Sequence, residues 1–250
     1  MQLITSLLAF AAVLGLSSAQ QKNKDPCALY DYYSGSGYEF LNNLWGKDAG
    51  NGSQCTYVDS DSPSGVSWHS TWTWKNGPNN VKSYPYSGLL LPKKPLLSQV
   101  KSMKSSASWS YNTSDIRANV AYDLFTSTDS NHTNSFGDYE LMIWLGKYGD
   151  ISPIGSSVGI VKVDGQDWDL WRGFNGAMKV FSFVAVKPPM TKFSGDLKAF
   201  FDYMATKGFE ASSQYLITYQ IGSEAFTGGP ATFTFHNWSA GLELKSKHRR

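Results

Sequence analysis

The feature that most constrains the fold is the alternation of side chains in residues 137–146, which read Gly-Asp-Tyr-Glu-Leu-Met-Ile-Trp-Leu-Gly. A period of two is typical of a β-strand whose two faces have different surroundings. One face is apolar and consists of Tyr139, Leu141, Ile143 and Leu145. The other consists of Glu140, Met142 and Trp144. A carboxylate, a thioether and an indole in a row favour the floor of a groove for a sugar polymer, where the indole can stack on a pyranose ring. The alternative is an edge strand with an exposed Glu and a covered Trp.

Similar short segments, separated by clusters of Gly, Asn, Asp, Ser and Pro, continue from residue 38 onward, as in a β-sandwich or jelly roll. We expect strands at 38–45, 66–74, 80–86, 89–91, 107–111, 116–125, 155–163, 167–171, 177–186, 214–226 and 233–238. Segments 107–111 and 116–125 should form a hairpin. Only 193–207 has helical spacing, with Ser194 as its cap and Gly208 after its end. The sequence therefore predicts an all-β fold with one helix packed outside the sheets.

Composition favours a single β domain and argues against a nucleic-acid binder. The chain has 250 residues, of which 17% are charged and 15% aromatic, whereas an average soluble domain is about 25% charged. The formal charge of +2 comes from a basic C-terminal tail at 241–250. The preceding part of the chain is close to neutral, so a nucleic-acid partner is not expected.

Residues 1–19 are typical of a secretory signal peptide, because an apolar run precedes small residues at the expected cleavage positions. We expect a secreted, extracellular protein that begins near Gln20 and has no membrane segment. Cys27 and Cys55 would then pair with each other in an oxidising compartment. Four Asn-x-Ser/Thr sequons are candidate N-glycosylation sites, at Asn51, Asn112, Asn131 and Asn237.

Three expected strands each place one acid on the face opposite the apolar one, namely Asp123, Glu140 and Glu224. Glycoside hydrolysis needs two carboxyl groups across a groove, one ionised and one protonated. Acids that lie close together in an aromatic site have pKa values that are pushed apart, which permits this division. The alternation alone is also compatible with ordinary half-buried strands.

Longer motifs help to decide between a glycosidase site and ordinary half-buried strands. They lie at 42–46 (Asn-Asn-Leu-Trp-Gly), 67–69 (Ser-Trp-His), 80–84 (Asn-Val-Lys-Ser-Tyr), 116–125 (Ile-Arg-Ala-Asn-Val-Ala-Tyr-Asp-Leu-Phe), 137–145 and 222–228 (Gly-Ser-Glu-Ala-Phe-Thr-Gly). In these motifs and in its cysteine pair, the chain resembles glycoside hydrolase family 12, the secreted endo-β-1,4-glucanases of fungi and bacteria. The resemblance runs from about Cys27 to Ser239. One departure is Ala225, where many members have proline.

The resemblance implies a β-jelly roll of two curved antiparallel sheets with one helix, and a catalytic domain at 20–240. It implies Glu140 as the nucleophile, Glu224 as the general acid/base and Asp123 as the supporting acid. Substrate would contact four further side chains, those of Asn43, Trp45, Met142 and Trp144. Retaining geometry would place the two catalytic carboxyl groups about 5–5.5 Å apart.

The expected partner is a β-glucan polysaccharide, and the protein should act as a monomer without a metal or organic cofactor. Cellulose-type and mixed-linkage glucans are the first expectation. The alternatives are a xyloglucan-specific endoglucanase, a xylanase of the related jelly-roll family, and a non-catalytic glucan-binding or host-recognised jelly roll.

Overall fold

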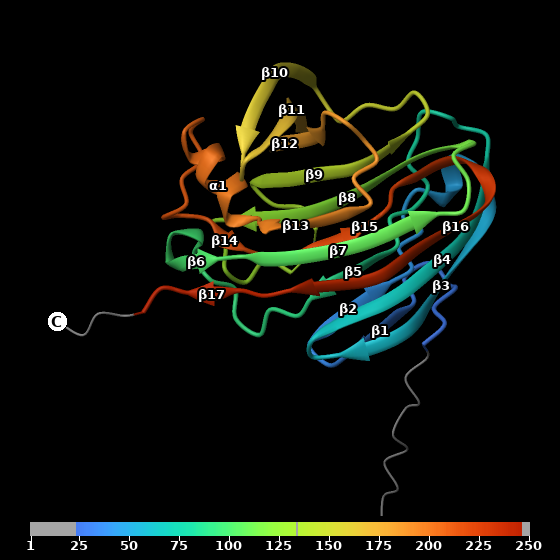
Figure 1. Cartoon of the computed structure of the whole chain (residues 1–250), viewed down its shortest axis with the longest axis horizontal. Coiled ribbons are helices and arrows are strands. Elements are labelled where there is room, and N and C mark those ends of the chain that lie inside the picture. The colour runs from blue at the N-terminus through green and yellow to red at the C-terminus, as the bar shows by residue number, and fades with distance from the viewer. Residues whose placement is uncertain (1–23, 134, 247–250) are drawn as a thin grey trace, which may run out of the picture.

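The computed structural model describes residues 24–133 and 135–246, and the expected signal peptide lies outside them. Two stacked β-sheets make up most of this part of the chain (Figure 1). The strands are β1 (Tyr32–Gly35), β2 (Tyr38–Leu41), β3 (Asn51–Ser62), β4 (Gly65–Lys75), β5 (Tyr86–Leu89), β6 (Val100–Ser102), β7 (Lys104–Tyr111), β8 (Ile116–Ser127), β9 (Tyr139–Tyr148), β10 (Ser156–Val163), β11 (Gln166–Asn175), β12 (Met178–Ala185), β13 (Lys192–Asp196), β14 (Tyr215–Leu216), β15 (Gln220–Gly222), β16 (Ala225–Ala240) and β17 (Glu243–Leu244).

The inner sheet has the strand order β1-β2-β5-β15-β8-β9-β12-β11-β10, and β14 also pairs with β8. The outer sheet has the order β3-β4-β16-β7-β13. Strand β16 belongs to both sheets, because its first residues pair with β8 and its later residues pair with β4 and β7. The change of sheet occurs at Gly228 and Gly229, whose positive φ angles of 124° and 93° suit glycine at a bend. This architecture is the predicted jelly roll.

Large apolar side chains fill the space between the two sheets. The predicted apolar face of β9 lies there, with Leu141, Ile143 and Leu145 fully buried. Trp68 of β4 faces them from the outer sheet and packs against Phe233 and Phe235. Because the core takes one face of each inner strand, the other face of the inner sheet is free to form a binding surface.

The helix α1 spans Lys198–Ala205 and is shorter than the predicted 193–207. The first part of the predicted helix is the strand β13, so the prediction that Ser194 caps the helix is wrong. The N-cap is Leu197, whose side chain makes no capping bond. The preceding Asp196 helps to fix the start of the helix, since its Oδ1 accepts hydrogen bonds from the backbone N–H groups of Lys198 (3.1 Å) and Met103 (2.7 Å). Phe200 of the helix packs on Trp168 and Phe183, which places α1 beside β11 and β12 (Figure 1).

Two further predictions about strands are wrong. Strands β7 and β8 do not form a hairpin, because β7 pairs with β13 and β16 whereas β8 pairs with β9, β14, β15 and β16. The connection at 112–115 instead carries the chain from one sheet to the other. The predicted single strand at 214–226 is divided into β14, β15 and the start of β16. The N–H groups of Ile217 and Thr218 both donate to the carbonyl of Phe125, and this irregularity turns Ile217 away from the core.

Several strands had no sequence prediction, namely β1, β3, β6, β13 and β17. Within the sheets, β9 and β12 form a parallel pair, whereas two antiparallel sheets were expected. The disulfide between Cys27 and Cys55 is confirmed. It fastens the N-terminal segment to β3, where Thr56 also donates to the carbonyl of Pro26 (2.8 Å).

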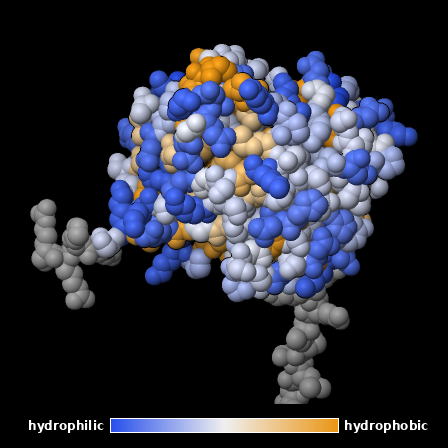
Figure 2. All heavy atoms as spheres, in the orientation of Figure 1, coloured by the Kyte–Doolittle hydropathy of each residue, from blue (hydrophilic) through white to orange (hydrophobic). Residues whose placement is uncertain are grey.

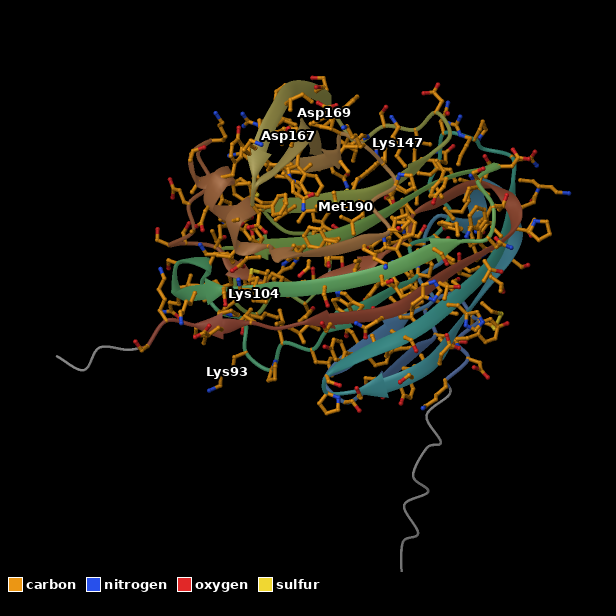
Figure 3. The ribbon with its side chains drawn as sticks, viewed as in Figure 1. Lys93, Lys104, Lys147, Asp167, Asp169 and Met190 are labelled. Atoms are coloured by element: carbon orange, nitrogen blue, oxygen red, sulfur yellow. A yellow bond between two sulfur atoms is a disulfide. The ribbon has the colours of Figure 1, made fainter. Side chains whose placement is uncertain are left out.

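Strand β10 is an edge of the inner sheet and exposes Val158 (57%) and Ile160 (60%). Figure 2 shows an orange, hydrophobic patch at the end of the molecule where Figure 1 shows β10. Figure 3 shows Asp167 and Asp169 at the same end. Asp167 forms an ion pair with Lys162 (2.9 Å), and charges of this kind protect an edge strand from pairing with other chains. Within the described residues, no helix combines the length and the apolar character needed to cross a membrane.

Candidate active site

A cleft of about 880 Å³ lies over the face of the inner sheet that is turned away from the core. Side chains from β2, β5, β8, β9 and β15 reach it, as do the loops that follow these strands. The three predicted acids and the four predicted contact residues all line this cleft, namely Asp123, Glu140, Glu224, Asn43, Trp45, Met142 and Trp144. The sequence therefore placed its candidate residues on one surface, although they come from positions 43 to 224.

The register of the inner sheet explains why Asp123 and Glu140 are neighbours. On the antiparallel pair of β8 and β9, Asp123 lies opposite Met142, and Phe125 lies opposite Glu140. Asp123 and Glu140 are thus diagonal neighbours on one face, a relation in which Cα atoms are about 7–8 Å apart and long side chains touch. Both are largely buried, with exposed fractions of 8% and 7%.

Glu224 comes from the short connection between β15 and β16, and Asn119 of β8 holds it. The backbone N–H of Glu224 donates to Oδ1 of Asn119 (2.8 Å), and Nδ2 of Asn119 donates to the carboxylate Oε2 of Glu224. Because a backbone N–H can only donate, the first bond fixes the amide orientation, and Nδ2 must face the carboxylate. Asn119 is fully buried, so this orientation is rigid.

A chain of hydrogen bonds supports Asn119 from the outer sheet. The indole Nε1 of Trp72 donates to the hydroxyl of Tyr111 (3.2 Å), which contacts Oγ of Ser223 (2.6 Å). The Ser223 hydroxyl in turn donates to the carbonyl of Asn119 (2.5 Å). Since an indole only donates, one consistent direction runs from Trp72 to Asn119. The position of Glu224 therefore depends on residues of both sheets.

Burial raises the pKa values of all three acids, and repulsion from neighbouring carboxylates adds to this at Asp123 and Glu140. The pKa of Asp123 lies well above its ordinary value because of desolvation and then the charges of Glu140 and Glu224. Desolvation and the charge of Glu224 raise the pKa of Glu140. Desolvation also raises the pKa of Glu224, while the hydrogen bond from Asn119 lowers it. With pKa values raised to about 8 at Glu140 and about 7 at Glu224, these two acids can change protonation state near neutral pH, as a site for proton transfer requires.

The four predicted contact residues differ in what they offer a ligand. Trp45 is 55% exposed and presents its ring to the cleft, whereas Trp144 is only 2% exposed. Trp144 packs in a cluster with Met142 and Ile151, and its indole donates weakly to the Met142 sulfur (3.5 Å). Trp144 therefore offers little open indole surface although it lines the cleft, and its contact with substrate stays a prediction. Asn43 has a left-handed backbone with φ of 48°, which asparagine tolerates better than most residues.

Two polar residues in or beside the cleft were not selected from the sequence. Asn119 lies on the same face of β8 as Asp123, the face turned away from the core. Glu39 lies on the corresponding face of β2, together with Leu41. The alternation within each strand could have identified both, but only the fold shows what they approach. The four sequon asparagines, Asn51, Asn112, Asn131 and Asn237, are all exposed, and their glycosylation stays a prediction.

Comparisons with known proteins identify relatives of this chain. The family model described as Glycosyl hydrolase family 12 matches residues 36–243. Endoglucanase A of Aspergillus kawachii is 47% identical over 240 residues, which cover 94% of this chain and 100% of the relative. A xyloglucan-specific endo-beta-1,4-glucanase A of Emericella nidulans is 41% identical and covers 94% of this chain and 99% of its own.

Among solved structures, the catalytic domain of Humicola grisea Cel12A, in complex with a soaked thio-cellotetraose, superposes with a TM-score of 0.86 at 50% identity. The match covers 88% of this chain and 99% of that domain. The family match argues against membership of the related xylanase family. The chain belongs to glycosyl hydrolase family 12.

Proposed function

We propose that this protein is a secreted, retaining endo-β-1,4-glucanase that cleaves internal bonds of cellulose-type and mixed-linkage β-glucans. The observation that carries the proposal is the convergence of Asp123, Glu140 and Glu224 in one cleft, with raised pKa values. Family membership and the endoglucanases among its relatives support the same reaction.

In the first step, a carboxylate oxygen of Glu140 forms a bond to the anomeric carbon while the glycosidic C–O bond breaks. Glu224 gives its proton to the departing glucan oxygen, so the leaving chain becomes a neutral alcohol. This step needs a negative charge on Glu140 and a proton on Glu224. A proton on Asp123 would remove one like charge beside Glu140 and make that distribution easier.

In the second step, water replaces the leaving group. Ionised Glu224 takes a proton from the water while the water oxygen bonds to the anomeric carbon, and the ester to Glu140 breaks. Two displacements at one carbon restore its configuration. The hydrogen bond from Asn119 favours the ionised Glu224 that this step requires.

The cleft also suits an internal segment of a polysaccharide. Its lining runs from Trp45 and Asn79 at one region to Asn175 and Met178 at another, and exposed Trp45 offers an apolar face to a sugar ring. A polymer could therefore lie across the acids and continue beyond them on both sides, which is what endo-acting cleavage demands. Secretion rests on the signal-like segment at 1–19 and on the disulfide.

The direct test is Glu140→Gln, assayed by release of reducing ends from barley β-glucan. We expect the variant to lose hydrolysis while its circular dichroism and unfolding transition stay close to those of the wild type. Full activity in the folded variant would refute the assignment of the nucleophile. Product analysis by proton NMR should show the β-anomer first, and an initial α-anomer would refute retention.

The wild-type enzyme should then be compared on carboxymethylcellulose, barley β-glucan, xyloglucan and xylan. Faster cleavage of xyloglucan than of the unbranched glucans would move the assignment toward the activity named for the Emericella nidulans relative. Glucan binding without release of reducing ends would favour the non-catalytic alternative.

A further inference from the structure

We infer that Glu39 forms a sugar-binding position of its own on the cleft floor, where its carboxylate accepts hydrogen bonds from hydroxyl groups of a neutral glucan chain. The inference rests on the proposed function, because it extends the same cleft. It adds a carboxylate that lies away from the three acids and takes no part in bond cleavage.

The sheet register places Glu39 on the same face as the acids. Glu39 of β2 lies opposite Gly88 of β5, which lies opposite Gln220 of β15, which lies opposite Asp123 of β8. Directly opposed residues share one face of a sheet. Three strand spacings separate Glu39 from Asp123, which is about 14 Å between Cα atoms. Glu39 therefore contacts a part of the ligand beyond the sugar that reacts.

Gly88 allows the Glu39 side chain to lie along the floor. A Cβ atom at position 88 would come within 2.9 Å of Oε1 and 3.0 Å of Cγ of Glu39, and within 3.3 Å of Cγ of Gln220. The Glu39 side chain thus extends over the glycine toward Gln220 and does not turn out into solvent. With any larger residue at position 88, the carboxylate would have to move.

Among the described residues, the carboxylate of Glu39 has a single hydrogen-bond partner and no ion-pair partner. Oε2 accepts one hydrogen bond, from the hydroxyl of Tyr32 (3.2 Å). Among the described residues, no protein donor bonds to Oε1 and no basic side chain forms an ion pair with Glu39. Burial raises the pKa of this carboxyl, so its position is unfavourable for an isolated charge. A free acceptor oxygen that lines a cleft is suited to a ligand hydroxyl.

The surroundings of Glu39 have the chemistry of a sugar site. Tyr30 and Tyr32 are 57% and 49% exposed, and Tyr86 and Leu41 line the same part of the cleft. Aromatic and aliphatic surface can cover the C–H face of a pyranose while a carboxylate accepts from its hydroxyl groups. A cationic ligand would also suit a carboxylate. We favour a neutral glucan because Glu39 lies in the same cleft that the proposed function assigns to a glucan chain.

The test measures binding without hydrolysis. Cellohexaose is titrated calorimetrically into Glu140→Gln protein, with and without Glu39→Gln, and the same series is repeated with cellotriose. We expect Glu39→Gln to weaken cellohexaose binding about tenfold, as loss of a hydrogen bond to a charged group implies. The weakening for cellotriose should be smaller, because a short chain can bind at the acids without reaching β2.

Two further variants separate binding from structure. Gly88→Ala leaves Glu39 in place in the sequence but displaces its carboxylate, and it should weaken cellohexaose binding similarly. Glu210→Gln makes the same substitution at an exposed position outside the cleft and should change nothing. The melting temperature of Glu39→Gln should equal that of the parent or exceed it, since an uncompensated, half-buried charge has been removed.

Equal cellohexaose affinity with and without Glu39→Gln would overturn the inference. So would a lower melting temperature for Glu39→Gln together with normal binding by Gly88→Ala, because the residue would then be structural. If the wild type failed to hydrolyse any glucan, the proposed function would fall. The calorimetric comparison would still decide whether Glu39 binds the sugar chain.

Discussion

Replacement of Asn119 by alanine should shift the alkaline limb of the pH–rate profile upward. Nδ2 of Asn119 is a hydrogen-bond donor to the Glu224 carboxylate, and no other described side chain donates to it. This bond stabilises the ionised form, so its loss raises the pKa of Glu224. Because Glu224 must carry a proton for the first step, a higher pKa extends activity toward alkaline pH.

The size of the shift follows from the hydrogen bond. A hydrogen bond to a charged group contributes about 1.5–3 kcal/mol, and one pKa unit corresponds to about 1.4 kcal/mol. The pKa of Glu224 is raised to about 7 with Asn119 present. Alanine at position 119 should therefore move it up by about 1–2 units. The site lies inside the cleft, so solvent screening will reduce this shift less than it would at the surface.

The assay is kcat/KM for an unactivated cello-oligosaccharide, measured between pH 4 and pH 10. Such a substrate has a poor leaving group, so cleavage depends on the proton from Glu224. Asn42→Ala is the matched control, because Asn42 is also fully buried and its Nδ2 donates to the carbonyl of Ala28 (3.1 Å), away from the acids. Asn42→Ala should be less stable than the wild type but should have the same alkaline limb in its pH–rate profile. If folded Asn119→Ala retained the wild-type alkaline limb, the role assigned to Asn119 would be wrong.

Two further predictions concern stability. Asp123 is protonated more readily in the folded than in the unfolded chain, so its contribution to stability falls as pH rises above about 4. The stability of Asp123→Asn relative to the wild type should therefore increase with pH, by up to about 1.4 kcal/mol per pH unit. Urea unfolding of both proteins at pH 4 and pH 6 measures this. The same stability difference at both pH values would contradict the prediction. The buried Lys82 Nζ donates to three carbonyls, including that of Phe226 (3.0 Å). Lys82→Met should lower the free energy of unfolding by about 3 kcal/mol or more. Lys101→Met, at an exposed ion pair, should lower it by less than about 1 kcal/mol. Equal losses would contradict a structural role for the three hydrogen bonds of Lys82.

Alternation could predict the strands and faces that carry the acids, because period-two patterning depends on burial by a sheet, and Leu141 and Ile143 were placed correctly for this reason. It could not predict pairing between distant segments. The chain connection suggested that β7 and β8 pair, but they lie in different sheets. The Trp144 indole illustrates the same limit, since it is buried in a cluster that includes Ile151 from the loop after β9 and Val184 from β12. The role of Glu39 depends on Gly88, which is 49 positions away in the sequence, and no sequence pattern indicates that these two residues are neighbours.

The environments of Glu140 and Glu224 differ in a way that suits different tasks. Both acids lie in a cleft where, among the described residues, neither forms an ion pair with a lysine, arginine or histidine. Glu224 has an amide donor held by a hydrogen-bonded chain, whereas Glu140 accepts no hydrogen bond from a described protein group. An acid that exchanges a proton twice per turnover benefits from a fixed donor that moderates its pKa. A pKa moderated in this way lets Glu224 lose and regain its proton near neutral pH, as a general acid/base must in each turnover. The asymmetry therefore favours Glu224 as the proton-exchanging acid of the pair, and the assignment of Glu140 as the nucleophile stays a prediction.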